Sequence, residues 1–275
     1  MTTLVAIQTI NSRGPSAFVL LSDSRLTAIN SKPSKVICDQ YKKTYCSPLG
    51  HYVVAFAGHN QPAEAAIESS IGLLENWHSP APSVLIDELG AAIENVLRQR
   101  ASSYRVSILH ATCDPKNNEF LAEEITFDPE AERTVRRRID FRQKQATASV
   151  AGRGTGLNRY AEALYLDQNL MQVRMRGGPL TAAEHVQKFS QFVASQEDPS
   201  TGGFVQGVTL NIDGTAKPIA FRYGEEFFLF GKKTGWNELR GNQQIELRSL
   251  QWDFLSHRDG DIKGRRNKGS LGKLQ

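Results

Sequence analysis

Short apolar runs of strand length alternate with two pairs of helical segments along the chain. Hydrophobic residues recur every three or four positions over 63–74 and 85–96, which places them on one face of a helix. Residues 157–170 and 181–195 are also predicted to be helical. Alternating or β-branched runs predict strands at 3–9, 17–22, 41–47, 52–57, 104–112, 119–127, 134–141, 146–151, 208–212, 218–223 and 225–230.

The order of these elements indicates the fold class. Successive strands joined by short turns predict antiparallel sheets, and paired helices must cover sheet faces. We therefore expect an α+β fold, a four-layer αββα sandwich with two stacked antiparallel β-sheets. The sandwich should span residues 1–230. Residues 231–275 should form a C-terminal extension that docks at most a short helix and ends in a basic, unstructured tail.

Composition narrows the functional classes. The chain has 275 residues, 40% of them hydrophobic, enough for one large domain. The formal net charge of +4 is carried entirely by residues 257–275, so no basic face for nucleic acid is predicted. Apolar runs are far shorter than the ~20 residues that cross a bilayer, and the N-terminus lacks a signal-peptide pattern. Three cysteines favour a reducing, cytoplasmic setting.

The beginning of the chain holds a possible nucleophile. Met1 precedes the small residue Thr2, and methionine is readily trimmed from such a start. Trimming would give Thr2 both a hydroxyl and a free α-amine, whose reference pKa of about 7.7–8.0 suits a general base. An amine on the same residue is one of the groups that can activate a threonine hydroxyl. Such starts are common, so further residues must support this interpretation.

Four further motifs follow in order. Ser22–Thr27 reads Ser-Asp-Ser-Arg-Leu-Thr after an apolar strand, Lys43 leads a strand, Ala55–Gly58 reads Ala-Phe-Ala-Gly before a helix, and Asp198–Gly203 reads Asp-Pro-Ser-Thr-Gly-Gly. Together with the Thr-Thr start, this combination resembles the catalytic β-type subunits of the proteasome and of its bacterial HslV-like relatives. These are N-terminal-nucleophile (Ntn) hydrolases with an αββα sandwich. The resemblance runs from Thr2 to about residue 230.

The resemblance implies a role for each matched residue. Thr2 would be the nucleophile through its Oγ. Lys43 would be the neighbouring cation that lowers the pKa of the amine and the cost of the alkoxide. Asp23 would pair with Lys43 and orient it. Gly58 would offer its backbone N–H to the oxyanion, a contribution of about 3–4 kcal/mol in comparable sites.

Three more residues are implied to contact the terminal amine. Asp198 and Thr201 would hydrogen-bond it, with Thr201 replacing the serine usual in the family. Where the family has Gly-Ser-Gly, this chain reads Ala-Gly-Arg-Gly-Thr-Gly over 151–156. Thr155 is the better substitute because it keeps a hydroxyl between two glycines. If the register instead places Arg153 there, a bulky cation would crowd the amine.

The substrate pocket is only partly predictable. Alternation along a strand would place Tyr41, Lys43 and Tyr45 on one face, with Ala55 on the neighbouring strand. The tyrosines could equally pack under a loop. We assign Tyr41, Tyr45 and Ala55 to substrate binding. Arg25 and Thr27, from the motif after the second strand, are assigned to it as well.

Other chemistry is not supported by the sequence. The glycine-rich segment has Leu157 at the sixth position of a dinucleotide fingerprint, which requires glycine there, and no P-loop lysine follows. The six histidines show no metal-ligand spacing. We predict no cofactor and no metal. The arginine run at 136–138 belongs to an exposed or subunit-facing strand.

The sequence therefore predicts a cytoplasmic threonine-type peptidase or amide hydrolase that uses Thr2 after removal of Met1. Peptides or unfolded proteins would be its substrates. The family's assemblies imply a homo-oligomer, a ring or stacked rings, with no nucleic-acid or membrane partner. Two alternatives remain: a catalytically silent structural subunit of the same fold, and an Ntn amidohydrolase that acts on small amides.

Overall fold

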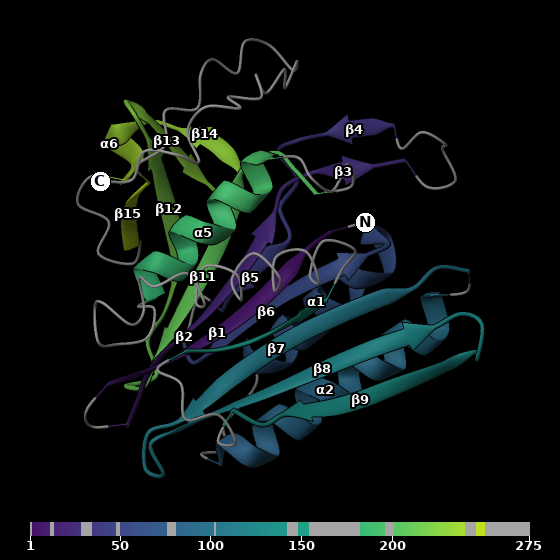
Figure 1. Ribbon diagram of the computed structural model, residues 1–275. Helices are drawn as coiled ribbons and strands as arrows, with labels where there is room; N and C mark the ends of the chain where they lie inside the picture. Colours follow the sequence, from purple (N-terminus) through teal and green to yellow (C-terminus); the bar gives the residue numbers. More distant parts are fainter. Residues whose placement is uncertain are drawn as a thin grey trace, which may run out of the picture.

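The computed structural model describes residues 2–11, 14–28, 35–47, 50–75, 81–101, 103–141, 148–153, 182–195, 201–239 and 246–250. These residues form a mixed α/β fold with mainly antiparallel sheets (Figure 1). Within them, no helix combines the length and apolar character needed to cross a lipid bilayer.

The first sheet contains the N-terminal strand. Its strands follow the order β10-β1-β2-β11-β12-β13-β14, and β15 adds to β12 as a parallel neighbour. Their bounds are β1 Leu4–Asn11, β2 Gly14–Asp23, β10 Ala148–Arg153, β11 Val205–Asn211, β12 Ala216–Tyr223, β13 Glu226–Leu229, β14 Lys232–Thr234 and β15 Glu246–Leu250.

The second sheet has the order β5-β6-β7-β8-β9 and is antiparallel throughout. A separate hairpin of β3 and β4 projects from the body near the N-terminus (Figure 1). The bounds are β3 Leu26–Thr27, β4 Val36–Cys38, β5 Thr44–Cys46, β6 Tyr52–Gly58, β7 Val106–Asp114, β8 Glu119–Asp128 and β9 Arg133–Ile139.

Three hydrophobic cores show how the sheets and helices pack. One core lies between the sheets and includes Leu4, Leu20 and Leu109. A second lies between the second sheet and helices α1 (Asn60–Glu75) and α2 (Pro82–Arg100). The third lies between the first sheet and α5 (Ala182–Ser195) (Figure 1). Because side chains alternate along a strand, β1 and β2 bury both faces, one in each of two cores.

Two regions differ from the sequence-based expectation. The strand expected over 41–47 is only β5, Thr44–Cys46. Before Thr44 the chain leaves the strand, although the carbonyl oxygen of Lys43 still accepts the N–H of Phe56 at 3.2 Å. Beyond residue 230 the first sheet continues with β14 and β15, which were not expected, whereas the short helix α6 (Trp236–Leu239) agrees with the expectation. The pairing of β15 with β12 is parallel, so the first sheet is not purely antiparallel. The helix expected over 157–170 lies outside the described residues.

Candidate active site

Asp23 is the central acceptor of a buried network at the end of β2. Its side chain is 0% exposed. Its Oδ1 accepts the backbone N–H of Thr3 at 3.0 Å. Its Oδ2 accepts the backbone N–H groups of Arg25 at 3.1 Å and Gly202 at 3.3 Å, together with the Lys43 ammonium at 3.3 Å. Four donors from four segments of the chain therefore meet at one carboxylate.

Lys43 completes a buried ion pair with this carboxylate. Its side chain is 1% exposed, and its ammonium also donates to the carbonyl oxygen of Arg25. Burial lowers the pKa of Lys43, and the charge of Asp23 opposes that shift. Burial likewise raises the pKa of Asp23, opposed by Lys43 and by the N–H groups of Gly202 and Thr3. Each charge thus depends on the other for compensation.

The two residues that precede β1 lie beside this pair. Thr2 is the first described residue and is 3% exposed. The hydroxyl oxygens of Thr3 and Thr201 are 2.6 Å apart, so one donates to the other. The Asp23 carboxylate therefore connects the Lys43 ammonium to the backbone that immediately follows Thr2.

Gly58 ends β6 in a conformation that requires glycine. Its φ is +103°, in the left-handed region, and a Cβ there would collide with the carbonyl oxygen of Arg105. It pairs with Val106, and α1 begins two residues later at Asn60. Replacement would strain the backbone at this position regardless of any catalytic role of the N–H group.

Of the two predicted substrate-binding residues that follow β2, Arg25 bonds to the network, and Thr27 lies in the β3–β4 hairpin. Arg25 is 6% exposed, and its Nε donates to Asp39 Oδ1 at 2.7 Å. Thr27 is half-buried in β3 and pairs with Val36 of β4. The guanidinium of Arg25 is therefore held by an acidic partner of the same hairpin region.

The other predicted substrate-binding residues lie in different environments. Tyr41 donates its hydroxyl proton to Glu64 Oε1 at 2.6 Å and accepts from Asn60 Nδ2 at 2.7 Å. Tyr41 and Tyr45 pack against the core beneath α1 and α2, whereas Ala55 is buried between the sheets. Strand alternation does not relate Tyr41 to Lys43, because β5 begins only at Thr44.

Two predicted site residues, Thr155 and Asp198, lie outside the described residues. The last described residue of β10 is Arg153, and its Cα partner in β1 is Leu4. The described part of the predicted site therefore consists of Thr2, Asp23, Lys43, Gly58 and Thr201.

Sequence reasoning missed two residues that hold this network together. Ser24 donates to the carbonyl oxygen of Asp39 at 2.5 Å and accepts the N–H of Phe204 at 2.7 Å. Gln206, 0% exposed on β11, bonds to both the Lys43 segment and the end of β2. The sequence marks Gln206 only as a single amide side chain in the otherwise apolar start of β11.

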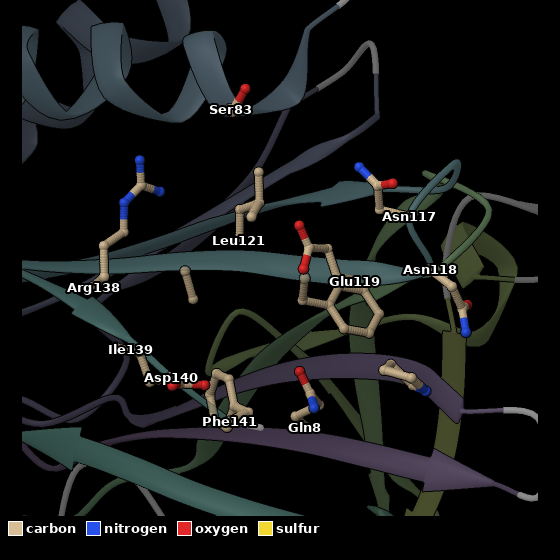
Figure 2. A pocket seen from close by; sticks show the side chains of 13 residues that line it. Gln8, Ser83, Asn117, Asn118, Glu119, Leu121, Arg138, Ile139, Asp140 and Phe141 are labelled. Carbon is tan, nitrogen blue, oxygen red and sulfur yellow. The ribbon is translucent and has the colours of Figure 1, made fainter. Parts of the chain in front are cut away.

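A cavity of about 760 Å³ lies elsewhere on the molecule (Figure 2). Gln8, Glu119, Arg138 and Phe141 are among its lining residues. Gln8 lies six residues after Thr2, so about 20 Å of extended chain separates this cavity from the N-terminus. A smaller cavity of about 330 Å³ is lined by Tyr45 and by residues of α1. Among the described residues, no group of three or more potential metal-ligating side chains is present.

Comparison with known proteins gave matches to solved structures only. No family model matches the chain, and no curated protein matches it. A solved structure of a mutant of Anbu from Hyphomicrobium sp. strain MC1 is similar, with a TM-score of 0.48 and 14% sequence identity. The match covers 78% of this chain and 86% of that chain.

Proposed function

We propose that the chain is a proteasome-like threonine hydrolase of the N-terminal-nucleophile class, built on an αββα sandwich. The observation that carries the proposal is the shared carboxylate of Asp23, which bonds to Lys43 and to the backbone N–H of Thr3. This arrangement anchors a buried ammonium next to the residue that follows Thr2. A threonine alkoxide forms more readily beside a fixed positive charge in a buried site.

Acylation begins once Met1 has been removed. The free α-amine of Thr2 takes the proton from Thr2 Oγ, directly or through a water, and the oxygen attacks the carbonyl carbon of the scissile amide. The Gly58 N–H donates to the developing oxyanion. Collapse of the tetrahedral intermediate breaks the C–N bond, and the α-ammonium returns its proton to the leaving amine. The product is an ester between Thr2 Oγ and the substrate acyl group.

Deacylation reverses these roles with water as the nucleophile. The α-amine of Thr2 deprotonates a water that attacks the ester carbonyl, and the Gly58 N–H again stabilises the oxyanion. Collapse breaks the bond to Thr2 Oγ, which regains a proton from the ammonium, and the carboxylic acid leaves. The enzyme returns to its starting state with one water consumed for each amide bond cleaved.

This mechanism implies a bell-shaped pH dependence. The amine must be neutral to act as a base, so activity rises as pH passes its pKa. Lys43 must be charged, so activity falls as pH passes the pKa of Lys43, which burial lowers. The two limbs of the profile would then report these two groups.

The terminal amine is proposed to be oriented by Thr155, Asp198 and Thr201. Counting along β10 supports Thr155 over Arg153 as the first of these. Arg153 pairs with Leu4, and Thr155 and Thr2 each lie two residues beyond that pair. The Thr201 hydroxyl already contacts the Thr3 side chain, next to the amine.

The substrates are proposed to be peptides or unfolded proteins, bound with the help of Arg25 and Thr27. The other residues predicted for this role, Tyr41, Tyr45 and Ala55, pack in or against the hydrophobic cores. A homo-oligomeric ring or stack of rings in the cytoplasm would enclose the sites and exclude folded proteins. These proposals follow from the resemblance of the sequence motifs to the proteasome-like family.

The proposal is tested by turnover of fluorogenic peptides with free and blocked N-termini, combined with the intact mass of the purified chain. We expect a mass that lacks Met1, cleavage of blocked peptides, and no cleavage by Thr2→Ala. A retained Met1 with no turnover would instead support the silent structural subunit. Turnover of small amides alone would support the amidohydrolase.

A further inference from the structure

Gln206 is a buried amide whose five hydrogen bonds join three segments of the site. Its Oε1 accepts hydrogen bonds from the backbone N–H of Lys43 at 2.8 Å and from the backbone N–H and the side-chain hydroxyl of Thr44, each at 3.3 Å. Its Nε2 donates to the carbonyl oxygens of Asp23 at 3.0 Å and Tyr41 at 2.8 Å. The side chain is 0% exposed.

The partners fix the orientation of this amide. The carbonyl side faces the two backbone N–H donors of Lys43 and Thr44, and the NH₂ side faces two backbone carbonyl oxygens. A flipped amide would set donor against donor and acceptor against acceptor. An acidic or an apolar side chain of the same size cannot satisfy all of these groups.

The location of Gln206 indicates why its hydrogen bonds matter for function. Gln206 lies on β11 and pairs in register with Ser22 of β2, one residue before Asp23. Lys43 precedes β5, which belongs to the other sheet. A single side chain therefore bonds to the backbone of both members of the Asp23–Lys43 pair, across the space between two sheets.

We propose that Gln206 is a positioning residue for catalysis, whose amide holds the backbones of Asp23 and Lys43 at the separation that keeps the Lys43 ammonium beside the N-terminal nucleophile. This inference rests on the proposed function. Gln206 contacts no reacting atom, and it acts through the ion pair. Misplacement by about 1 Å can cost roughly 100-fold in rate in other enzymes.

The signature of this role differs from that of a purely structural role. If Lys43 moves away from Asp23, the carboxylate no longer opposes the effect of burial, so the pKa of Lys43 falls further. The alkaline limb of the pH profile then moves to lower pH. A loss of folded protein alone would scale kcat down by the same factor at every pH.

The chain offers a matched pair of variants on one strand. Gln206→Met keeps the size of the side chain and removes all five hydrogen bonds. Thr209→Val, three residues along β11, also replaces a buried polar side chain with an apolar one, and Thr209 Oγ1 has no hydrogen-bond partner among the described residues. Gln206→Glu keeps an acceptor for Lys43 and Thr44 and serves as the second variant if Gln206→Met does not fold.

The first readout is amide hydrogen exchange of the peptide covering residues 41–46, which needs no activity. We expect faster exchange at Lys43 and Thr44 in Gln206→Met, and wild-type exchange in Thr209→Val. Unchanged exchange in Gln206→Met would mean that the Gln206 amide does not hold the backbone at Lys43 and Thr44, whatever the protein catalyses.

The second readout is the pH profile of kcat and KM with a fluorogenic peptide. In Gln206→Met we expect kcat to fall by at least tenfold, on the order of the misplacement effect above, while KM stays within threefold of wild type. The alkaline limb of its profile should lie at lower pH. Thr209→Val should keep wild-type values. An unshifted profile, or kcat that only follows the folded fraction, would overturn the positioning role. Absence of turnover in the wild-type protein would refute the proposed function, and the exchange result would stand separately.

Discussion

The Nε2 atom of His110 lies 3.3 Å from the Glu123 carboxylate, within ion-pair distance, although the geometry is not that of a hydrogen bond. His110 is 0% exposed, and its ring contacts the ring of Tyr52. Glu123 also binds Arg136, at 2.9 Å from Nη2. A buried histidine thus lies between the second sheet and its helices, beside a carboxylate that another cation already neutralises.

This arrangement predicts acid-sensitive stability. Burial lowers the pKa of His110 below 6.5, although Glu123 opposes the shift. The unfolded chain therefore binds more protons than the folded chain as pH falls below about 6.5, and stability decreases. Thermal melting at pH 7.5 and pH 5.5 measures this loss. It should be smaller in His110→Phe than in wild type.

The control for this measurement is His59→Phe, which retains the ring contact with Tyr104. It should lose as much stability on acidification as wild type. If His110→Phe and wild type lose equal stability between the two pH values, His110 does not titrate with unfolding in this way.

Replacing Gly58 with alanine is expected to destabilise the fold. Gly58→Ala places a Cβ against the carbonyl of Arg105 at a φ of +103°, so unfolding in urea should show a loss of about 1–3 kcal/mol. Gly72→Ala is the control, because it lies in α1 with open space around it. Alanine there should stabilise the helix by up to about 1 kcal/mol. Equal stability of Gly58→Ala and wild type would contradict the observed backbone.

The buried pair predicts unequal effects of its two single substitutions. Asp23→Asn leaves the Lys43 ammonium buried with the Arg25 carbonyl as its other acceptor, and should destabilise by about 3–5 kcal/mol. Lys43→Met should cost less, because Asp23 keeps three backbone N–H donors. Urea unfolding at pH 7 compares the two. A larger loss for Lys43→Met would mean that these N–H groups do not compensate the carboxylate.

The register of β10 predicts which side chain serves the terminal amine. If Thr155 orients it, Thr155→Val should lower kcat by roughly 10- to 100-fold, the value of one hydrogen bond to a charged group. Arg153→Ala should keep kcat close to wild type. Steady-state turnover of one peptide decides the matter. Higher activity in Arg153→Ala, with no effect of Thr155→Val, would reverse the assignment.

The sequence predicted the elements that carry a clear apolar pattern. β1, β2 and β6 were predicted from short alternating or β-branched apolar runs, and α1 and α2 because apolar residues recur at helical spacing. The Asp23–Lys43 contact followed from a motif resemblance, and the structure contains it as an ion pair. Its catalytic role stays a proposal.

Other features depend on contacts distant in sequence. Gln206 has the appearance of an ordinary strand residue until β5 and the end of β2 are placed around it. The parallel pairing of β15 with β12 cannot be read from a five-residue segment. Tyr41 was assigned to the face of Lys43 by alternation, which fails because the segment before Thr44 is not a strand.

The central claim is that the unblocked Thr2 provides both hydroxyl and amine beside the Lys43 charge. The most direct measurement is peptide mass mapping after treatment with an epoxyketone, which requires both groups on one residue to form its ring. The account predicts a single adduct on Thr2 in the wild-type protein, slower formation in Lys43→Met, and none in Thr2→Ala. An unmodified Thr2 in protein that has lost Met1 would contradict it.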